Sequence, residues 1–112
     1  MESNRLEKVS RLLQKELGNL LQREAITICP GKMITVTSVR VTPDLGIARV
    51  NISIFPTNDV KDVLKLVKAQ TKHFRHLLGN NVRNQLRIVP NLEFFIDDSL
   101  DYIEKIDNLL KK

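Results

Sequence analysis

The segment from residue 47 to residue 74, IARVNISIFPTNDVKDVLKLVKAQTKHF, decides the fold because its hydrophobic period changes within it. In its first nine residues apolar and polar side chains alternate, which indicates a strand with one face in the core. Pro56-Thr57-Asn58-Asp59 then ends the strand and supplies an N-cap. From Val60 to Leu86 apolar residues recur at helical spacing, which predicts helix. The apolar stripe weakens at Lys68–Lys72, so a kink or a break between two helices is expected there.

The residues before this segment predict a helix, a loop and a first strand. Leucine and valine recur at helical spacing over residues 4–23, which indicates a helix with one apolar face. A loop with proline and glycine precedes the β-rich residues 33–42. Thr42-Pro43-Asp44-Leu45-Gly46 has the composition of a hairpin loop, so this strand is expected to pair with residues 47–55. The apolar residues change phase within the first strand, which predicts a β-bulge near Thr37-Ser38.

The residues after the helical region complete the predicted fold. Leu92–Ile96 is a short apolar run typical of a strand, and Asp97-Asp98-Ser99 is expected to cap a last helix over Leu100–Leu110. The order is therefore α-β-β-α-α-β with a short C-terminal helix. A chain of 112 residues buries one modest core. We expect an α+β fold, a single domain over residues 1–112, in which a three-stranded sheet packs on helices.

Two features of the sequence bear on compartment and redox chemistry. It has no run of about 18 apolar residues, and the charged N-terminus lacks the apolar core of a signal peptide. We therefore expect a cytoplasmic protein with no membrane contact. Cys29 is the single cysteine, so no internal disulfide is possible, and a small buried filler is a better interpretation than a nucleophile.

Nothing in the sequence indicates catalysis or a metal centre. The phosphate-loop, serine-hydrolase and zinc-protease motifs are missing. His73 and His76 have a spacing that can hold a metal, but neither a further histidine nor paired cysteines complete the set. Asp97, Asp98 and Asp101 could bind Mg²⁺ or act as general acids, yet acids at the start of a helix are better explained as capping residues. We expect a protein that is not an enzyme and needs no cofactor.

Positive charge is concentrated in one segment. The net charge is +5, and residues 60–90 contain seven basic residues and one acid. On a continuous helix five of the basic residues fall within a sector of about 80°; they are Lys61, Lys65, Lys68, Lys72 and Arg75. Such a stripe matches an RNA backbone or forms a solvated face that keeps the protein soluble, and charge alone does not separate the two. The shortage of acids on this side favours RNA.

The aromatic residues do not predict base recognition. The chain has four phenylalanines, one tyrosine and no tryptophan, and no cluster resembles the stacking platform of an RNA recognition motif. Phe74 and one of the pair Phe94 and Phe95 are expected in the core. We therefore expect RNA contacts that do not read the base sequence.

Three pieces of the sequence, which together span nearly the whole chain, carry recognisable patterns. The most specific piece is residues 86–99, LRIVPNLEFFIDDS, which carries an L-R-x-x-P-x-L-x-F-x-x-D-x-S pattern. The other two are Leu20-Leu21-Gln22-Arg23-Glu24 in the first helix and residues 39–45, VRVTPDL, followed by Ala48-Arg49-Val50. Together the three pieces resemble the ribosome-binding factor A family.

The resemblance implies a type II KH-like fold in which two helices meet at a kink. It also implies a non-enzymatic factor that binds the free 30S ribosomal subunit and its 16S rRNA, supports processing of the 16S rRNA precursor and is linked to growth in the cold. A standard KH domain grips nucleic acid through a GxxG loop, which the family replaces by an Ala-x-Gly kink. Here Gln70-Thr71-Lys72 occupies that position, so contacts are expected from side chains rather than from a glycine-lined backbone.

We predict RNA contacts at basic residues of the two helices and, as an extension of the same surface, of the sheet: Lys65, Lys68, Lys72, Arg75, Arg83, Arg40 and Arg49. We expect a monomer whose partners are the 30S subunit and precursor 16S rRNA. Two other functions stay open. One is a generic KH-type RNA-binding module, and the other is a protein-interaction module that uses the apolar and acidic C-terminal segment.

Overall fold

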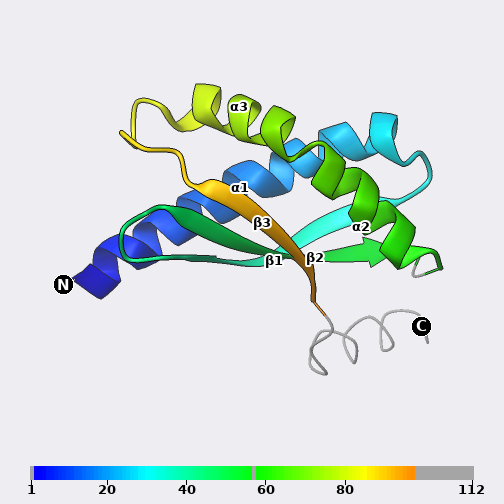
Figure 1. Cartoon of the computed structure of the whole chain (residues 1–112), viewed down its shortest axis with the longest axis horizontal. Coiled ribbons are helices and arrows are strands. Elements are labelled where there is room, and N and C mark those ends of the chain that lie inside the picture. Colours follow the sequence, from blue (N-terminus) through cyan, green and yellow to red (C-terminus); the bar gives the residue numbers. More distant parts are fainter. Residues whose placement is uncertain (1, 57, 98–112) are drawn as a thin grey trace.

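The computed structural model describes residues 2–56 and 58–97, with side chains from residue 5 onward (Figure 1). Its elements are, in order, α1 (Glu2–Ile28), β1 (Met33–Val41), β2 (Ile47–Phe55), α2 (Val60–Ala69), α3 (Thr71–Val82) and β3 (Asn91–Ile96). This order confirms the predicted α+β fold with one three-stranded sheet. The predicted helix Leu100–Leu110, with its caps Asp98 and Ser99, lies outside the described residues.

The three strands lie in the order β1-β2-β3. β1 is antiparallel to β2, whereas β3 is parallel to β2 because the chain crosses over through α2 and α3. The register of β1 and β2 shifts between Val36 and Ser38, which confirms the predicted bulge. The extra residue, Thr37, donates a hydrogen bond from its hydroxyl to the carboxylate of Asp97. The bulge therefore ties the end of β3 to the middle of β1.

The helices cover one face of the sheet. Along β2 every second residue is buried against them: Ala48, Val50, Ile52 and Ile54. α1 packs on β1, and α3 and α2 follow one another along the opposite side of the helical layer, against β3 (Figure 1). Phe74 of α3 is wholly buried and meets Phe94 of β3 edge-on, with ring centroids 6.0 Å apart. Phe95 is exposed, so the expectation that Phe74 and one of the two neighbouring phenylalanines enter the core is confirmed.

The first helix is longer than predicted. It continues past residue 23 to Ile28, and the predicted end is wrong. Ala25, at 2% exposure, extends its buried face by a further turn, and Cys29, the first residue after the helix, is also buried, at 6% exposure. Ile26, the large apolar residue between them, is instead exposed. Alanine and cysteine are weak signals of an apolar face, which is why the periodicity predicts an end near residue 23.

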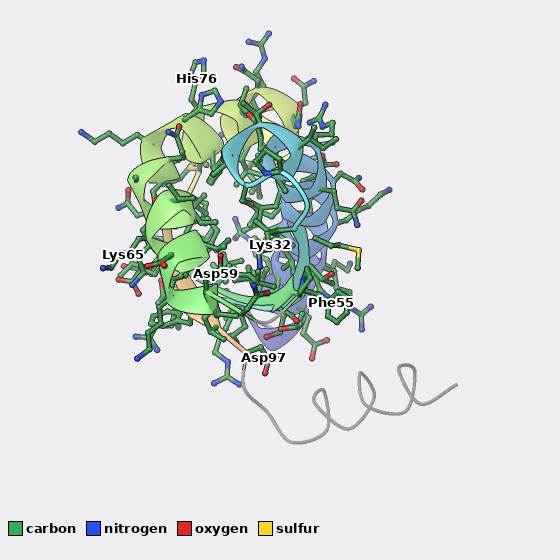
Figure 2. All side chains as sticks on the ribbon, turned by 90° about the vertical axis from the view of Figure 1, so that its right-hand side faces the viewer. Lys32, Phe55, Asp59, Lys65, His76 and Asp97 are labelled. Atoms are coloured by element: carbon green, nitrogen blue, oxygen red, sulfur yellow. The ribbon has the colours of Figure 1, made fainter. Side chains whose placement is uncertain are left out.

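Lys32 holds the loop between β2 and α2. Its ammonium lies 2.8 Å from a carboxylate oxygen of Asp59 and donates to the backbone oxygens of Pro56 and Asn58 at 3.2 and 2.9 Å. Figure 2 shows Lys32 and Asp59 close together at the base of α2. Asp59 occupies the predicted N-cap position, but its side chain makes no capping hydrogen bond. The predicted N-cap position is therefore correct, but the predicted capping hydrogen bond is not formed. The Asp59 carboxylate instead makes an ion pair with the Lys32 ammonium.

Candidate nucleic-acid interface

The exposed side of α2 and α3 carries most of the basic residues predicted to contact RNA. In α2 the buried residues are Val63 and Val67, whereas the three lysines of this helix are exposed to solvent. Asp62 is the one acid in these two helices. Figure 2 shows Lys65 pointing away from the body of the molecule. The exposed cations of both helices, called here the helix stripe, are Lys61, Lys65, Lys68, Lys72 and Arg75.

The helix stripe crosses a break at Gln70. α2 ends one residue before it and α3 begins one residue after it, which confirms the predicted break. The Gln70 N–H donates to the Val67 oxygen at 3.0 Å, and the Thr71 hydroxyl donates to the Lys68 oxygen at 2.7 Å. These polar groups are used within the break itself. The charged side chains on either side of the break are those of Lys68 and Lys72, and their phosphate contacts stay a prediction.

Arg75 has a structural role that sequence reasoning missed. Its guanidinium donates to the backbone oxygen of Val89 at 2.7 Å through Nη2 and to that of Pro90 at 3.2 Å through Nε. These bonds attach α3 to the segment that leads into β3. Nothing in the spacing of the charged residues signals this use, because Arg75 and its acceptors lie about fifteen residues apart. Its predicted contact with RNA stays a prediction.

The two histidines of α3 differ in their surroundings. His73 Nε2 lies 2.8 Å from Glu24 Oε1, so this pair links α3 to the end of α1. His76 is exposed and points outward at the top of the molecule in Figure 2. Among residues 5–56 and 58–97, no group of three or more His, Cys, Asp and Glu side chains is placed to hold a metal ion.

The predicted sheet arginines do not extend the helix stripe. Arg40 and Arg49 are partners in the β1–β2 register and are exposed. Their chain neighbours Ala48 and Val50 point into the core, so the two arginines occupy the face of the sheet that the helices leave uncovered. The expectation of one continuous basic surface is wrong. A strand sends alternate side chains to opposite faces, and that alternation separates the arginines from α2 and α3.

Cys29 lies between α1 and β1 and is 6% exposed. Burial raises the pKa of its thiol, and the nearby positive charge of Lys32 opposes that effect. A buried thiol with a raised pKa is a poor nucleophile at neutral pH. The interpretation of Cys29 as a buried filler is confirmed. In the part of the chain that the structure describes, no helix has the length and apolar character to cross a membrane.

The fold matches solved structures of ribosome-binding factor A. The crystal structure of ribosome-binding factor A from Thermus thermophilus aligns with a TM-score of 0.69, at 20% identity, over 81% of this chain and 94% of that chain. Coordinates of the Thermus thermophilus factor fitted into the cryo-EM map of a 30S complex align with a TM-score of 0.59 at 24% identity, over 75% of this chain and 90% of that chain. At these identities the likeness supports the fold.

Sequence comparison finds relatives with much higher sequence identity than these structures. The family model for ribosome-binding factor A matches residues 5–110. Ribosome-binding factor A of Flavobacterium johnsoniae is 50% identical over 111 residues, which covers 98% of this chain and 85% of the relative. The Cytophaga hutchinsonii protein of the same name is 39% identical over 112 residues, covering 100% of this chain and 84% of the relative. With the fold and the basic helices already in place, these matches show that the chain belongs to the ribosome-binding factor A family.

Proposed function

We propose that this protein is an assembly factor of the small ribosomal subunit, which binds free 30S subunits and 16S rRNA and supports processing of the 16S rRNA precursor. The observation that carries the proposal is the helix stripe, a row of exposed cations on helices that contain a single acid. The 30S complex of the Thermus thermophilus factor supports the choice of partner. In this proposal residues 1–112 act as one cytoplasmic, monomeric ribosome-binding domain without enzymatic activity.

Binding through the helix stripe would rest on side-chain charge. Lysine and arginine on phosphate oxygens supply affinity and orientation, and release of counterions drives the association. Lys65, Lys68, Lys72 and Arg83 are the proposed phosphate contacts, because all four are exposed. Arg75 is proposed to combine such a contact with its hydrogen bonds to the segment before β3.

The proposal is tested by reversing charge on the helix stripe while leaving Arg75 intact. The variant carries Lys65→Glu, Lys68→Glu and Lys72→Glu, all at exposed positions. We expect loss of co-sedimentation with free small subunits and an unchanged circular-dichroism spectrum. A matched control places three glutamates at exposed positions of α1, namely Lys8, Arg11 and Lys15. Equal loss in both variants, or retained binding in the first, would contradict the proposal.

The alternatives differ in the RNA they would recover. Crosslinking in cells followed by sequencing should yield precursor 16S rRNA if the protein is a 30S assembly factor. A broad spread of RNAs would instead identify a generic RNA-binding module. A protein-interaction module would recover little RNA, and its complexes should survive moderate salt, which weakens a phosphate-dominated complex steeply.

A further inference from the structure

The face of the sheet opposite the helices contains a hollow. Its side chains offer the kinds of contact that a nucleotide uses: positive charge, hydrogen-bonding groups and an aromatic ring. Its volume is about 340 Å³, and it opens on solvent. It is lined by residues of all three strands: Ser38, Val39, Arg40, Arg49, Asn51 and Phe95. Two of these side chains are cationic, two offer hydrogen bonds and one is an aromatic ring. The helix stripe differs from this hollow, because its five residues are all charged and none of them is aromatic.

The two arginines of the hollow are set directly against one another. Arg40 and Arg49 are partners in the β1–β2 register, and like charges in that position repel. Glu93, on the neighbouring strand β3, is the register partner of Arg49, and its Oε1 lies 3.8 Å from Arg49 Nε. Both side chains are about half exposed, so this ion pair is weak. Within residues 5–56 and 58–97, Arg40 has no acidic partner. The positive charge of the two arginines is therefore only weakly compensated within the described residues, which favours binding of an anion in the hollow.

An exposed aromatic ring forms the other half of the hollow. Phe95 is 44% exposed, whereas Phe94 and Leu92 on the same strand are buried. Its register partner is Asn51, whose amide donates to the Ser38 hydroxyl at 2.9 Å. That bond fixes the polar residues beside the ring. A half-exposed ring that lines the hollow leaves part of its surface free to contact a planar group.

We propose that Arg40, Arg49, Asn51 and Phe95, called here the sheet platform, bind a single-stranded stretch of RNA. An unpaired base stacks on Phe95, and its phosphate lies between the two guanidinium groups. Every base has a π-face, so the contact does not depend on base sequence. An acidic peptide would satisfy the arginines but would leave the ring without a stacking partner. The inference rests on the proposed RNA-binding function and adds a second site, on the opposite side of the sheet, that selects unpaired RNA.

The test uses Phe95→Trp as a reporter, because the chain has no tryptophan of its own. Single-stranded oligoadenylate is added to the full-length protein, and tryptophan fluorescence is followed. We expect strong quenching as a base stacks on the indole, and little change with duplex RNA of equal length or with polyglutamate. In the parent protein Phe95→Leu, which removes the ring, should weaken oligoadenylate binding roughly tenfold. Arg40→Gln with Arg49→Gln should weaken it as well.

Two controls make the outcome specific. Ile26→Trp places the reporter on α1 at a position that is 75% exposed, and its fluorescence should not respond to the oligonucleotide. The Phe95→Trp reporter is also combined with the three glutamates at Lys65, Lys68 and Lys72, and quenching should persist. Absent quenching, or equal quenching by duplex RNA or polyglutamate, overturns the sheet platform. Loss of subunit binding is measured separately, so failure of the proposed function and failure of the sheet platform remain distinguishable.

Discussion

Arg75 is the residue whose removal should affect stability most clearly among the exposed cations of α3. Arg75→Ala deletes two charge-assisted hydrogen bonds, to the backbone oxygens of Val89 and of the buried Pro90. We expect a loss of about 1–2 kcal/mol in the free energy of unfolding, measured by urea denaturation. Lys72→Ala, at an exposed position one turn earlier, is the control and should change stability by less than about 0.5 kcal/mol. Equal effects of the two substitutions would contradict this role for Arg75.

The Asp44 carboxylate, in the hairpin between β1 and β2, is expected to make the stability of the folded protein depend on pH. The Thr42 hydroxyl, at 2.7 Å, and the Gly46 N–H, at 3.0 Å, donate to its carboxylate and lower its pKa. A lowered folded-state pKa means that the carboxylate stabilises the folded protein above the ordinary aspartate pKa. That stabilisation is lost as the pH falls through the lowered value. Asp44→Ala should therefore be less stable than the parent at neutral pH.

The difference between Asp44→Ala and the parent should narrow as the pH falls below about 4. Urea midpoints measured across this range provide the test. Asp44→Asn keeps a side-chain oxygen that can accept from Thr42 and Gly46, so it should lose less stability at neutral pH than the alanine variant. If the difference in urea midpoint between Asp44→Ala and the parent instead widens in acid, the ionised carboxylate does not stabilise the hairpin.

At the scale of single elements, α1 contains a glycine that its packing does not require. A Cβ built on Gly18 meets no atom within 4 Å. Glycine inside a helix is less favourable than alanine by about 1 kcal/mol. Gly18→Ala should therefore stabilise the protein by about 0.5–1 kcal/mol, seen as a higher midpoint of thermal unfolding. Gly31, with a φ of 87°, is the opposite case, and Gly31→Ala should destabilise.

The α2–α3 break determines how one row of cations is presented. On a straight helix the five residues of the helix stripe would form a single line. Gln70 divides that line, and Phe74 and Phe94 then hold α3 against β3. The stripe is therefore displayed on two short helices whose directions are set by separate contacts with the sheet. Its geometry depends on packing below the helices as well as on the spacing of the lysines.

At the scale of the whole molecule, the two arginines of the sheet and the lysines of the helices belong to opposite faces. Binding of small subunits through phosphates should weaken as salt rises, with a linear relation between the logarithms of affinity and salt concentration. Changing Lys65, Lys68 or Lys72 to glutamine should lower that slope by about 1 for each phosphate contact removed. Lys8→Gln on α1 should leave it unchanged. Slopes equal to that of the parent would show that these lysines do not contact phosphate.

Much of the fold follows from local patterns that the sequence alone contains. The alternation in residues 47–55, the helical spacing after Val60 and the phase change near Thr37 predicted β2, the helical pair and the bulge. These features depend on side chains close together in the chain, so periodicity reveals them. Family membership was predictable for the same reason, because residues 86–99 carry a specific local pattern.

Only the tertiary structure decided which charged residues share a surface. Arg40 and Arg49 look like part of one basic set in the sequence, but strand alternation and the sheet order place them opposite the helices. Arg75 looks like a free cation, yet its acceptors come from a segment that only folding brings to it. The type and spacing of a residue determine the element it forms and the charge it carries. Its neighbours across the sheet or on another helix come from long-range packing, which no local pattern encodes.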